Sequence, residues 1–258
     1  MRPPGPTFAA GLTSAGEGAP HLALALQQHQ RYCEALRACG LEVTEIAPLP
    51  AYPDGTFVED AAVVTARGAI ITRPGAPTRR GETETVAQAL RSFYPVLHRI
   101  EAPGTVDGGD VCEAAGHFFI GLSARTNESG ARQLQSILEA LGYRAEIVDI
   151  RASAALLHLK TGIAYLGDGV WVIAGGMERE LPALRSAAVR DVIAPPADER
   201  YAANCVRVND AVLVPAGCPT VAAEIERRGF HALPLDVSEF RKMDGGLSCL
   251  SLRVPNRV

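Results

Sequence analysis

Short, mostly apolar runs separated by turn residues recur along the chain. Each pair of runs flanks a turn that contains glycine, asparagine or aspartate, which is the pattern of a β-hairpin. The predicted hairpins join 61–65 to 69–72, 111–113 to 118–120, 163–166 to 170–173 and 205–208 to 211–214. The run 249–254 would supply half of a fifth hairpin.

A helical spacing of apolar residues follows several of these hairpins. Another helix is expected early in the chain, where Gly40 would form the C-cap. The predicted helices cover about 21–39, 86–93, 131–141 and 221–225, and strands are expected after two of them at 41–43 and 145–148. The unit strand–strand–helix–strand therefore repeats about every 42 to 52 residues.

This repeat favours an α/β fold with blades around an axis. In a doubly wound sheet, by contrast, single strands alternate with helices. No linker-like stretch interrupts the repeat, so residues 1–258 are predicted to form a single domain. The proline-rich segments 1–6 and 195–196 are expected to be a loose end and a loop.

The repeat also aligns one position in every unit. The residues just before the first strands are Asp60, Asp110, Gly162, Asn204 and Ser248. In a radial arrangement, such equivalent positions converge at one end of the axis. The side chains expected to meet there are those of Glu59, Asp60, Asp107, Asp110, His158, Thr161 and Cys249.

Composition excludes several classes of protein. The formal net charge of the 258 residues is -4, which argues against a nucleic-acid partner and mildly favours a cationic ligand. No apolar run reaches the length of a membrane span, and the first residues lack a signal-peptide core, so a cytoplasmic location is expected.

The six cysteines show no short metal-ligand spacing, and disulfides are not expected without a secretory signal. Cys33 falls on an apolar helical face and is interpreted as core. Cys249 instead follows a glycine pair in polar surroundings, which indicates a residue presented to a ligand.

A thiol beside an imidazole is the arrangement for covalent catalysis, because the thiolate attacks and the imidazole handles protons. A carboxylate on the second ring nitrogen would orient the imidazole, and further carboxylates would hold a cationic substrate. Other interpretations compete with this one. His158 could be a core histidine on an apolar strand, Asp107 and Asp110 turn residues around two glycines, and Arg79 with Arg80 a solvated loop pair. One thiol and one imidazole are too few for a structural zinc site.

Several longer motifs resemble dimethylarginine dimethylaminohydrolase. They occur in the family's order and span most of the chain, at 57–60, 71–80, 107–110, 121–127, 157–161 and 244–249. The chain resembles the bacterial branch of this family, within the guanidino-modifying superfamily that also includes arginine deiminases and amidinotransferases. The fold that this resemblance implies is the five-bladed α/β propeller, or pentein, which agrees with the repeat.

The resemblance implies a role for each matching residue. Cys249 would be the nucleophile, His158 the general acid and base, and Asp107, which is Glu in some relatives, the residue that orients His158. Arg79 and Arg125 would hold the substrate carboxylate. The other residues that would bind substrate are Asp54, Phe57, Glu59, Asp60, Met243, Asp244 and Leu12, the last in a lid loop.

The implied reaction converts Nω-methylated arginines to citrulline and methylamine or dimethylamine through a covalent thiouronium on Cys249. No metal or organic cofactor is required, although zinc could block the site by binding the thiolate and imidazole. A homodimer is compatible with the resemblance. Family members usually begin with an apolar strand ahead of an Arg–Pro run, and this chain starts almost at Arg2 and Pro3, so that strand is expected to be missing or very short.

Three alternatives stay open at this point. Arginine deiminase would use the same nucleophile on unmethylated arginine, and the room beside the terminal nitrogens would distinguish the two enzymes. A non-catalytic protein that binds amino acids on the same scaffold is the second. The third is a structural propeller whose loops bind another protein.

Overall fold

The computed structural model describes residues 1–153, 156–177 and 189–255. It contains four three-stranded sheets of one topology, in which an antiparallel hairpin is extended by a third strand parallel to the second. The first unit consists of β1 (Ala62–Val64), β2 (Ala69–Ile71), α2 (Thr83–Leu90) and β3 (Leu97–Arg99). In it, Ala62 pairs with Ile71 across the hairpin, and Ile71 also pairs with Arg99.

The other three sheets repeat this pattern. The second unit comprises β4 (Val111–Ala114), β5 (His117–Leu122), α3 (Glu128–Ala140) and β6 (Arg144–Asp149). The third has β7 (Ile163–Gly167), β8 (Val170–Ile173) and β9 (Asp191–Ile193). The fourth has β10 (Val206–Val208), β11 (Ala211–Pro215), α6 (Pro219–Glu226) and β12 (His231–Leu235). All four predicted hairpins are therefore confirmed, together with the helices and strand predicted after them.

The middle strand of each sheet is buried, because helices or neighbouring units cover both faces. Every residue of β2, β8 and β11 is buried, for example. A continuous apolar run marks such a strand in sequence. The turns between hairpin strands use left-handed backbone where the sequence supplies glycine, aspartate or asparagine, as at Gly167–Gly169 and Asn209.

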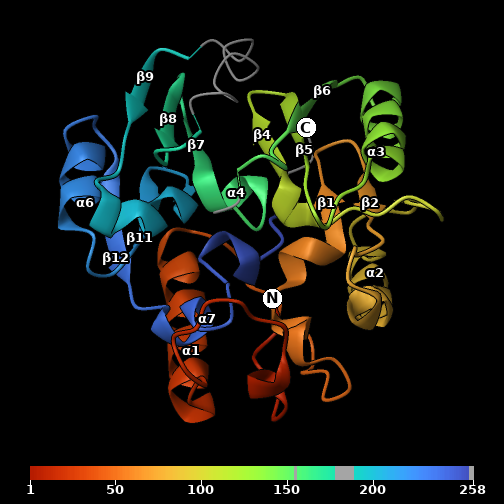
Figure 1. The fold of residues 1–258 in the computed structure, drawn as a ribbon, viewed down its shortest axis with the longest axis horizontal. Helices are drawn as coiled ribbons and strands as arrows, with labels where there is room; N and C mark the ends of the chain where they lie inside the picture. The colour runs from red at the N-terminus through yellow and green to blue at the C-terminus, as the bar shows by residue number, and fades with distance from the viewer. Residues whose placement is uncertain (154–155, 178–188, 256–258) are drawn as a thin grey trace.

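A fifth unit is assembled from both ends of the chain. It contains α1 (Leu22–Ala38), α7 (Ser238–Arg241), and the 3-10 turns η1 (Phe8–Ala10) and η8 (Ser248–Leu250). Figure 1 shows α1 beside α7. Gln28 Nε2 donates to Ser238 Oγ at 2.9 Å, and Tyr32 Oη donates to the carbonyl of Leu247 at 2.8 Å. The predicted helix over 21–39 and its end at Gly40, whose φ is +86°, are confirmed.

The strands predicted for this fifth unit are wrong. Neither 41–43 nor 249–254 forms a strand, and Cys249 lies within the turn η8. Strand-like pairing just after the first segment comes from Met1, whose amine donates to the carbonyl of Thr44 while its carbonyl accepts from Ile46 N–H, both at 2.9 Å. The ladder cannot continue, because Pro3 and Pro4 have no N–H to donate.

The N-terminal segment is also not the loose end that its prolines suggested. Arg2 is 1% exposed and donates to the carbonyls of Ala47 and Gly55 and to Thr85 Oγ1. None of the helices in the described ranges is long and apolar enough to cross a membrane.

One short helical turn precedes the first strand, or the final extended segment, of every unit. These turns are η3 (Val58–Ala61), η5 (Gly108–Asp110), α4 (Leu159–Gly162), η7 (Ala197–Asn204) and η8. Hydrogen bonds join them in a ring, such as Leu159 N–H to Asp110 Oδ1 and Ser248 Oγ to Glu59 Oε2. The predicted convergence of the positions before the strands is therefore confirmed, and α4 lies near the centre of Figure 1.

Candidate active site

Cys249 stands on the turn η8, which a glycine pair introduces. Its N–H donates to the carbonyl of Gly246 at 3.2 Å, and its side chain is partly exposed. Both glycines are required by close packing, since a Cβ on Gly245 would lie 2.2 Å from the Phe57 ring and one on Gly246 2.4 Å from Asn204 Oδ1. The local sequence therefore fixes where the thiol is presented.

The thiol faces a small cavity of about 20 Å³, enough for roughly one water molecule. The residues that line it are Leu12, Asp54, Phe57, Asp60, Arg79, Arg125, Leu157, His158, Met243, Asp244, Gly245 and Cys249. Ten of these twelve were predicted to act on or bind the substrate; Leu157 and Gly245 were not singled out. The structure thus brings together residues from both ends and the middle of the sequence.

His158 is the N-cap of α4, not a residue of an apolar strand. Its Nε2 lies 3.1 Å from Asp107 Oδ2, and Asp107 Oδ1 accepts from Gly75 N–H at 2.9 Å. The other ring nitrogen faces Gly109, where a Cβ would approach Nδ1 to 2.7 Å. Asp107 is fully buried, so turn formation alone does not explain it. In the Asp-Gly-Gly-Asp run, the Asp107 carboxylate instead contacts His158 Nε2, and the absence of a side chain on Gly109 leaves space for the imidazole ring.

Asp110, the second acid of that run, supports the same histidine through the backbone. Its Oδ1 accepts from Leu159 N–H at 3.0 Å, and its Oδ2 accepts from Ser123 Oγ and Thr126 Oγ1. Burial raises the pKa of Asp110 to about 6 against the opposing effect of His158. The sequence placed Asp110 near the pocket, but its contact with the turn that carries His158 could not be foreseen.

The charges of the site set the protonation of its two reactive groups. Burial alone lowers the pKa of His158, but Asp60, Asp110 and Asp107 outweigh it and raise the pKa to about 9. Burial, with Glu59 and Asp60, raises the pKa of the Cys249 thiol well above its ordinary value. The free site at neutral pH therefore holds a thiol and an imidazolium.

Arg79 is buried, not a member of a solvated loop pair. Its Nη1 donates to Asp60 Oδ2 at 2.7 Å and its Nη2 to Glu82 Oε1 at 2.5 Å. Although burial opposes its ionisation, His158 and Arg79 lower the pKa of Asp60 to about 2, so this carboxylate is charged. Glu82, which the sequence did not single out, is thus part of the support for Asp60.

Arg125 differs from Arg79 in the same cavity wall. It is only partly buried, and its guanidinium forms no ion pair with the residues that the structure describes. A Cβ on Gly75 would lie 2.3 Å from the carbonyl oxygen of Arg125, so glycine allows the two loops to touch. Of the two arginines, Arg125 is the one whose donors remain available.

The loop after Gly11 covers the cavity. Leu12 N–H donates to Asp54 Oδ1 at 3.0 Å, while Thr13 Oγ1 donates to the carbonyl of Lys242 at 2.8 Å. Ser14 N–H donates to Asp244 Oδ2 at 2.5 Å. Leu12 itself is 42% exposed, so polar contacts more than apolar burial hold this loop in place.

Glu59 is one predicted ligand-binding residue that the structure does not bring to this cavity. Its carboxylate accepts from Lys160 Nζ at 2.7 Å and from Ser248 Oγ at 2.8 Å. It lines a second, larger cavity of about 450 Å³, together with Lys160, Cys112 and Arg253. Neither Cys249 nor His158 lines that larger cavity. The cavity of about 20 Å³ that both residues line is therefore the candidate active site.

Asp60, Asp107 and His158 offer three potential metal ligands within 4.8 Å of one another. Each carboxylate is already engaged, however, since Asp60 accepts from Arg79 and from Gly109 N–H, and Asp107 accepts from Gly75 N–H. The group therefore suits acid–base chemistry on a cationic substrate better than metal binding. A nucleophilic thiol, a carboxylate-supported imidazole and a charged Asp60 together permit attack on an electron-poor carbon with proton delivery to a leaving group.

Comparison with known proteins agrees with this chemistry. A family model described as arginine deiminase matches residues 44–199. The N(G),N(G)-dimethylarginine dimethylaminohydrolase of Pseudomonas aeruginosa is 46% identical over 98% of this chain and 97% of its own length. The protein of the same name from Streptomyces coelicolor is 36% identical over 98% of this chain and 95% of its own length.

Solved structures give the same picture. A mutant of the Pseudomonas aeruginosa enzyme in complex with citrulline superposes with a TM-score of 0.93 at 45% identity, covering 98% of this chain and 96% of that one. The N-terminal domain of a cyanobacterial arginine dihydrolase superposes with a TM-score of 0.88 at 18% identity, covering 98% of this chain and 96% of that one, which shows a shared fold alone.

Proposed function

This chain belongs to the dimethylarginine dimethylaminohydrolase family, and we propose that it hydrolyses Nω-methylated arginines to citrulline. The products from asymmetric dimethylarginine and monomethylarginine are dimethylamine and methylamine. The observation that carries this proposal is that Cys249, His158 and Asp60 line one cavity, while Asp107, outside its lining, supports His158 through Nε2.

The substrate guanidinium would pair with Asp60, which the site keeps charged. Its positive charge would then favour loss of the Cys249 proton to solvent, since that thiol is neutral in the free site and His158 already carries a proton. The carboxylate of the amino acid would bind Arg125. The guanidinium of Arg79 is engaged by Asp60 and Glu82 and would reach the same carboxylate only by exchanging one of them.

The Cys249 thiolate would attack the guanidinium carbon, forming a carbon–sulfur bond. His158, protonated at neutral pH, would give its proton to the methylated nitrogen as the bond from carbon to that nitrogen breaks. The amine leaves and a thiouronium remains on Cys249. The now neutral His158 would take a proton from water, which adds to the same carbon. The carbon–sulfur bond then breaks as the added hydroxyl loses its proton to solvent, where the departed amine takes up one proton, and citrulline and the Cys249 thiolate are released.

Access to the cavity would require the loop at 11–14 to move. About 20 Å³ does not hold an arginine side chain, and Leu12 and Ser14 tie that loop to the cavity wall through Asp54 and Asp244. Closure of the loop after binding would exclude water from the covalent step. Met243, Asp244 and Phe57 would surround the reacting end of the substrate.

Arginine deiminase is the enzymatic alternative, favoured by the family model that matches residues 44–199. Incubation with asymmetric dimethylarginine, monomethylarginine and arginine, followed by measurement of citrulline, separates the two. Citrulline from the methylated substrates supports the proposal, whereas citrulline from arginine alone would overturn it. Mass spectrometry of quenched protein should show a thiouronium adduct on Cys249, absent from Cys249→Ser.

A cytoplasmic location, a homodimer and a single domain over residues 1–258 stay predictions. Sedimentation equilibrium would determine the oligomeric state, and one cooperative unfolding transition would support the single domain.

A further inference from the structure

A second group of ligand-type side chains lies on α1 and the segment that follows it. His29 and Cys33 are four residues apart, so they project from one face of the helix, and Cys33 Sγ lies 3.7 Å from His29 Nδ1. Glu45 approaches from the segment after Gly40, and one donor atom from each of the three lies within 4.8 Å of the others. None of them lines the cavity around Cys249.

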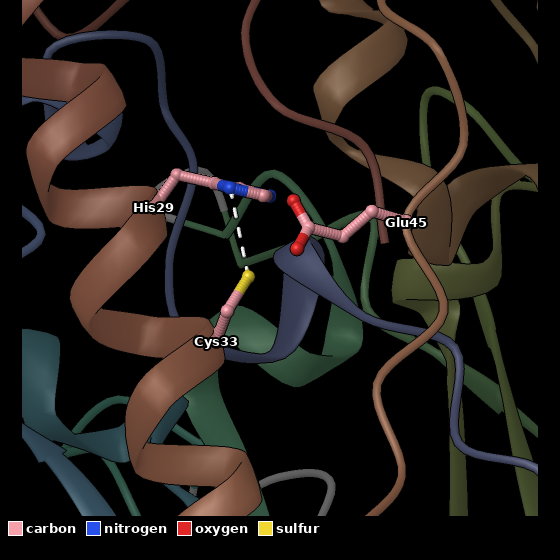
Figure 2. A group of neighbouring side chains, drawn as sticks. All are labelled: His29, Cys33 and Glu45. Atoms are coloured by element: carbon pink, nitrogen blue, oxygen red, sulfur yellow. Dashed lines mark hydrogen bonds between the residues drawn. The ribbon is translucent and has the colours of Figure 1, made fainter.

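The two ring nitrogens of His29 differ in their contacts, because Nδ1 faces Cys33 Sγ. His29 is 2% exposed, yet its Nε2 has no hydrogen-bond partner among the described residues. Figure 2 shows the Glu45 carboxylate directed toward the far edge of the imidazole ring, with Cys33 below the ring.

We propose that His29, Cys33 and Glu45 form a zinc site. An imidazole nitrogen, a thiolate and a carboxylate are the three donor types of protein zinc sites, at metal distances of about 2.0–2.3 Å. Two ligands of a tetrahedral ion then lie roughly 3.5 Å apart. The separation of 3.7 Å between Cys33 Sγ and His29 Nδ1 fits that requirement without movement of the helix.

The Glu45 carboxylate can complete the site because a surface ion pair is its hydrogen-bonded contact and is readily exchanged. Glu45 Oε1 now accepts from Arg37 Nη2 at 3.0 Å, but the two side chains are 42% and 48% exposed, so this ion pair is easily exchanged. Met1 Sδ, 3.7 Å from Cys33 Sγ, is a further soft atom nearby. Water or this thioether would take the fourth position on the metal.

The thiol sets the condition under which the ion binds. Zinc binds the thiolate, so the Cys33 proton must leave, and burial of this thiol makes that release costly. The bound ion would link α1 to the segment 41–47 in the fifth unit, which is bonded through the backbone of Thr44 and Ile46 to Met1. Zinc should therefore raise the melting temperature of the protein.

Cobalt can be used in place of zinc to detect the site, because a cobalt–thiolate bond gives a near-ultraviolet charge-transfer band that can be measured. The protein to use is full-length Cys249→Ser, in which the catalytic thiol cannot bind metal. We expect one cobalt-thiolate band and one zinc per chain by equilibrium dialysis. The double variant Cys33→Ala/Cys249→Ser should lose both the cobalt–thiolate band and the bound zinc. Adding Cys39→Ala should change neither, because Cys39 ends the same helix but is outside the group.

A variant at the exposed carboxylate covers the case in which Cys33→Ala does not fold. Glu45→Gln in the Cys249→Ser protein should bind zinc at least about 10-fold more weakly, with unchanged circular dichroism. The proposal is overturned if Cys249→Ser gives no cobalt–thiolate band, if that band survives in folded Cys33→Ala, or if Glu45→Gln binds zinc as tightly as its parent.

Discussion

His158 Nε2 lies 3.1 Å from Asp107 Oδ2 at the inner end of two different units of the fold. These residues are 51 positions apart in the chain, and each reaches the other because a short helical turn begins beside it. The contact fixes the imidazole and, with Asp60 and Asp110, keeps it protonated at neutral pH. It is the relationship on which proton delivery to the leaving amine would depend.

Replacement of Asp107 by Asn should slow catalysis far more than it weakens substrate binding. The amide keeps the shape but removes the charge that supports the imidazolium, so kcat should fall by about 10²- to 10⁴-fold. Steady-state citrulline formation measures this. Asp107→Glu, which restores a carboxylate, should recover part of the activity. Equal kcat in Asp107→Asn and wild type would contradict the role given to Asp107.

Arg125→Ala should raise KM with little change in kcat, because the lost contact is to the unreactive carboxylate of the substrate. A hydrogen bond to a charged group contributes about 1.5–3 kcal/mol, so KM should rise roughly 10- to 100-fold. Arg132→Ala, which removes an exposed arginine paired with Glu128 on α3, is the matched control. An unchanged KM in Arg125→Ala would assign the carboxylate to another residue.

Gly11→Ala should disturb the loop that covers the cavity. The new Cβ would lie 2.6 Å from Asp54 Oδ1, the atom that accepts from Leu12 N–H. Loss of that hydrogen bond should raise KM by roughly 10-fold. Gly175→Ala is the control, since a Cβ there meets nothing within 4 Å. If Gly11→Ala has wild-type KM and kcat, this bond does not hold the loop for catalysis.

Alkylation of free Cys249 should require alkaline pH. Burial and the carboxylates Glu59 and Asp60 raise its pKa, so the thiolate is scarce below that pKa and its fraction grows as pH rises. The rate with iodoacetamide should have its midpoint above about 8.5, the ordinary value for a thiol. Mass spectrometry locates the adduct, and Cys249→Ser gives the background. A rate already maximal at pH 7 would show a preformed thiolate.

Glu59→Gln should act on the thiol more than on substrate affinity. Removing this negative charge lowers the pKa of Cys249, so the alkylation curve should move to lower pH while KM changes little, because Glu59 faces the larger cavity. Glu113→Gln, in the wall of the same cavity, serves as control. A large rise in KM with no shift of the alkylation curve would instead indicate that Glu59 binds the substrate.

The sequence determined the repeated unit and the meeting of its inner ends. Paired apolar runs predicted four hairpins correctly, because a buried strand and its turn leave a local pattern. The equivalent positions of Asp60, Asp110 and Ser248 within the repeat then indicated that distant residues converge. The resemblance supplied roles for Cys249 and His158 that the pattern alone left open.

Other features depended on contacts that no local pattern records. The strand predicted at 41–43 does not form, and the pairing that Met1 begins beside it cannot extend because Pro3 and Pro4 have no N–H to donate. Arg79 and Arg125 look alike in sequence, yet burial against Asp60 and Glu82 engages one and leaves the other available.

The division between the two kinds of information has a physical cause. Hairpins, helices and the glycine turn before Cys249 follow from interactions among neighbours in the chain, which the sequence displays directly. The direction in which Glu59 faces, the protonation of His158 and the approach of Glu45 to His29 depend on charges and burial contributed by residues far away in sequence. Only the folded chain brings those groups within reach of one another.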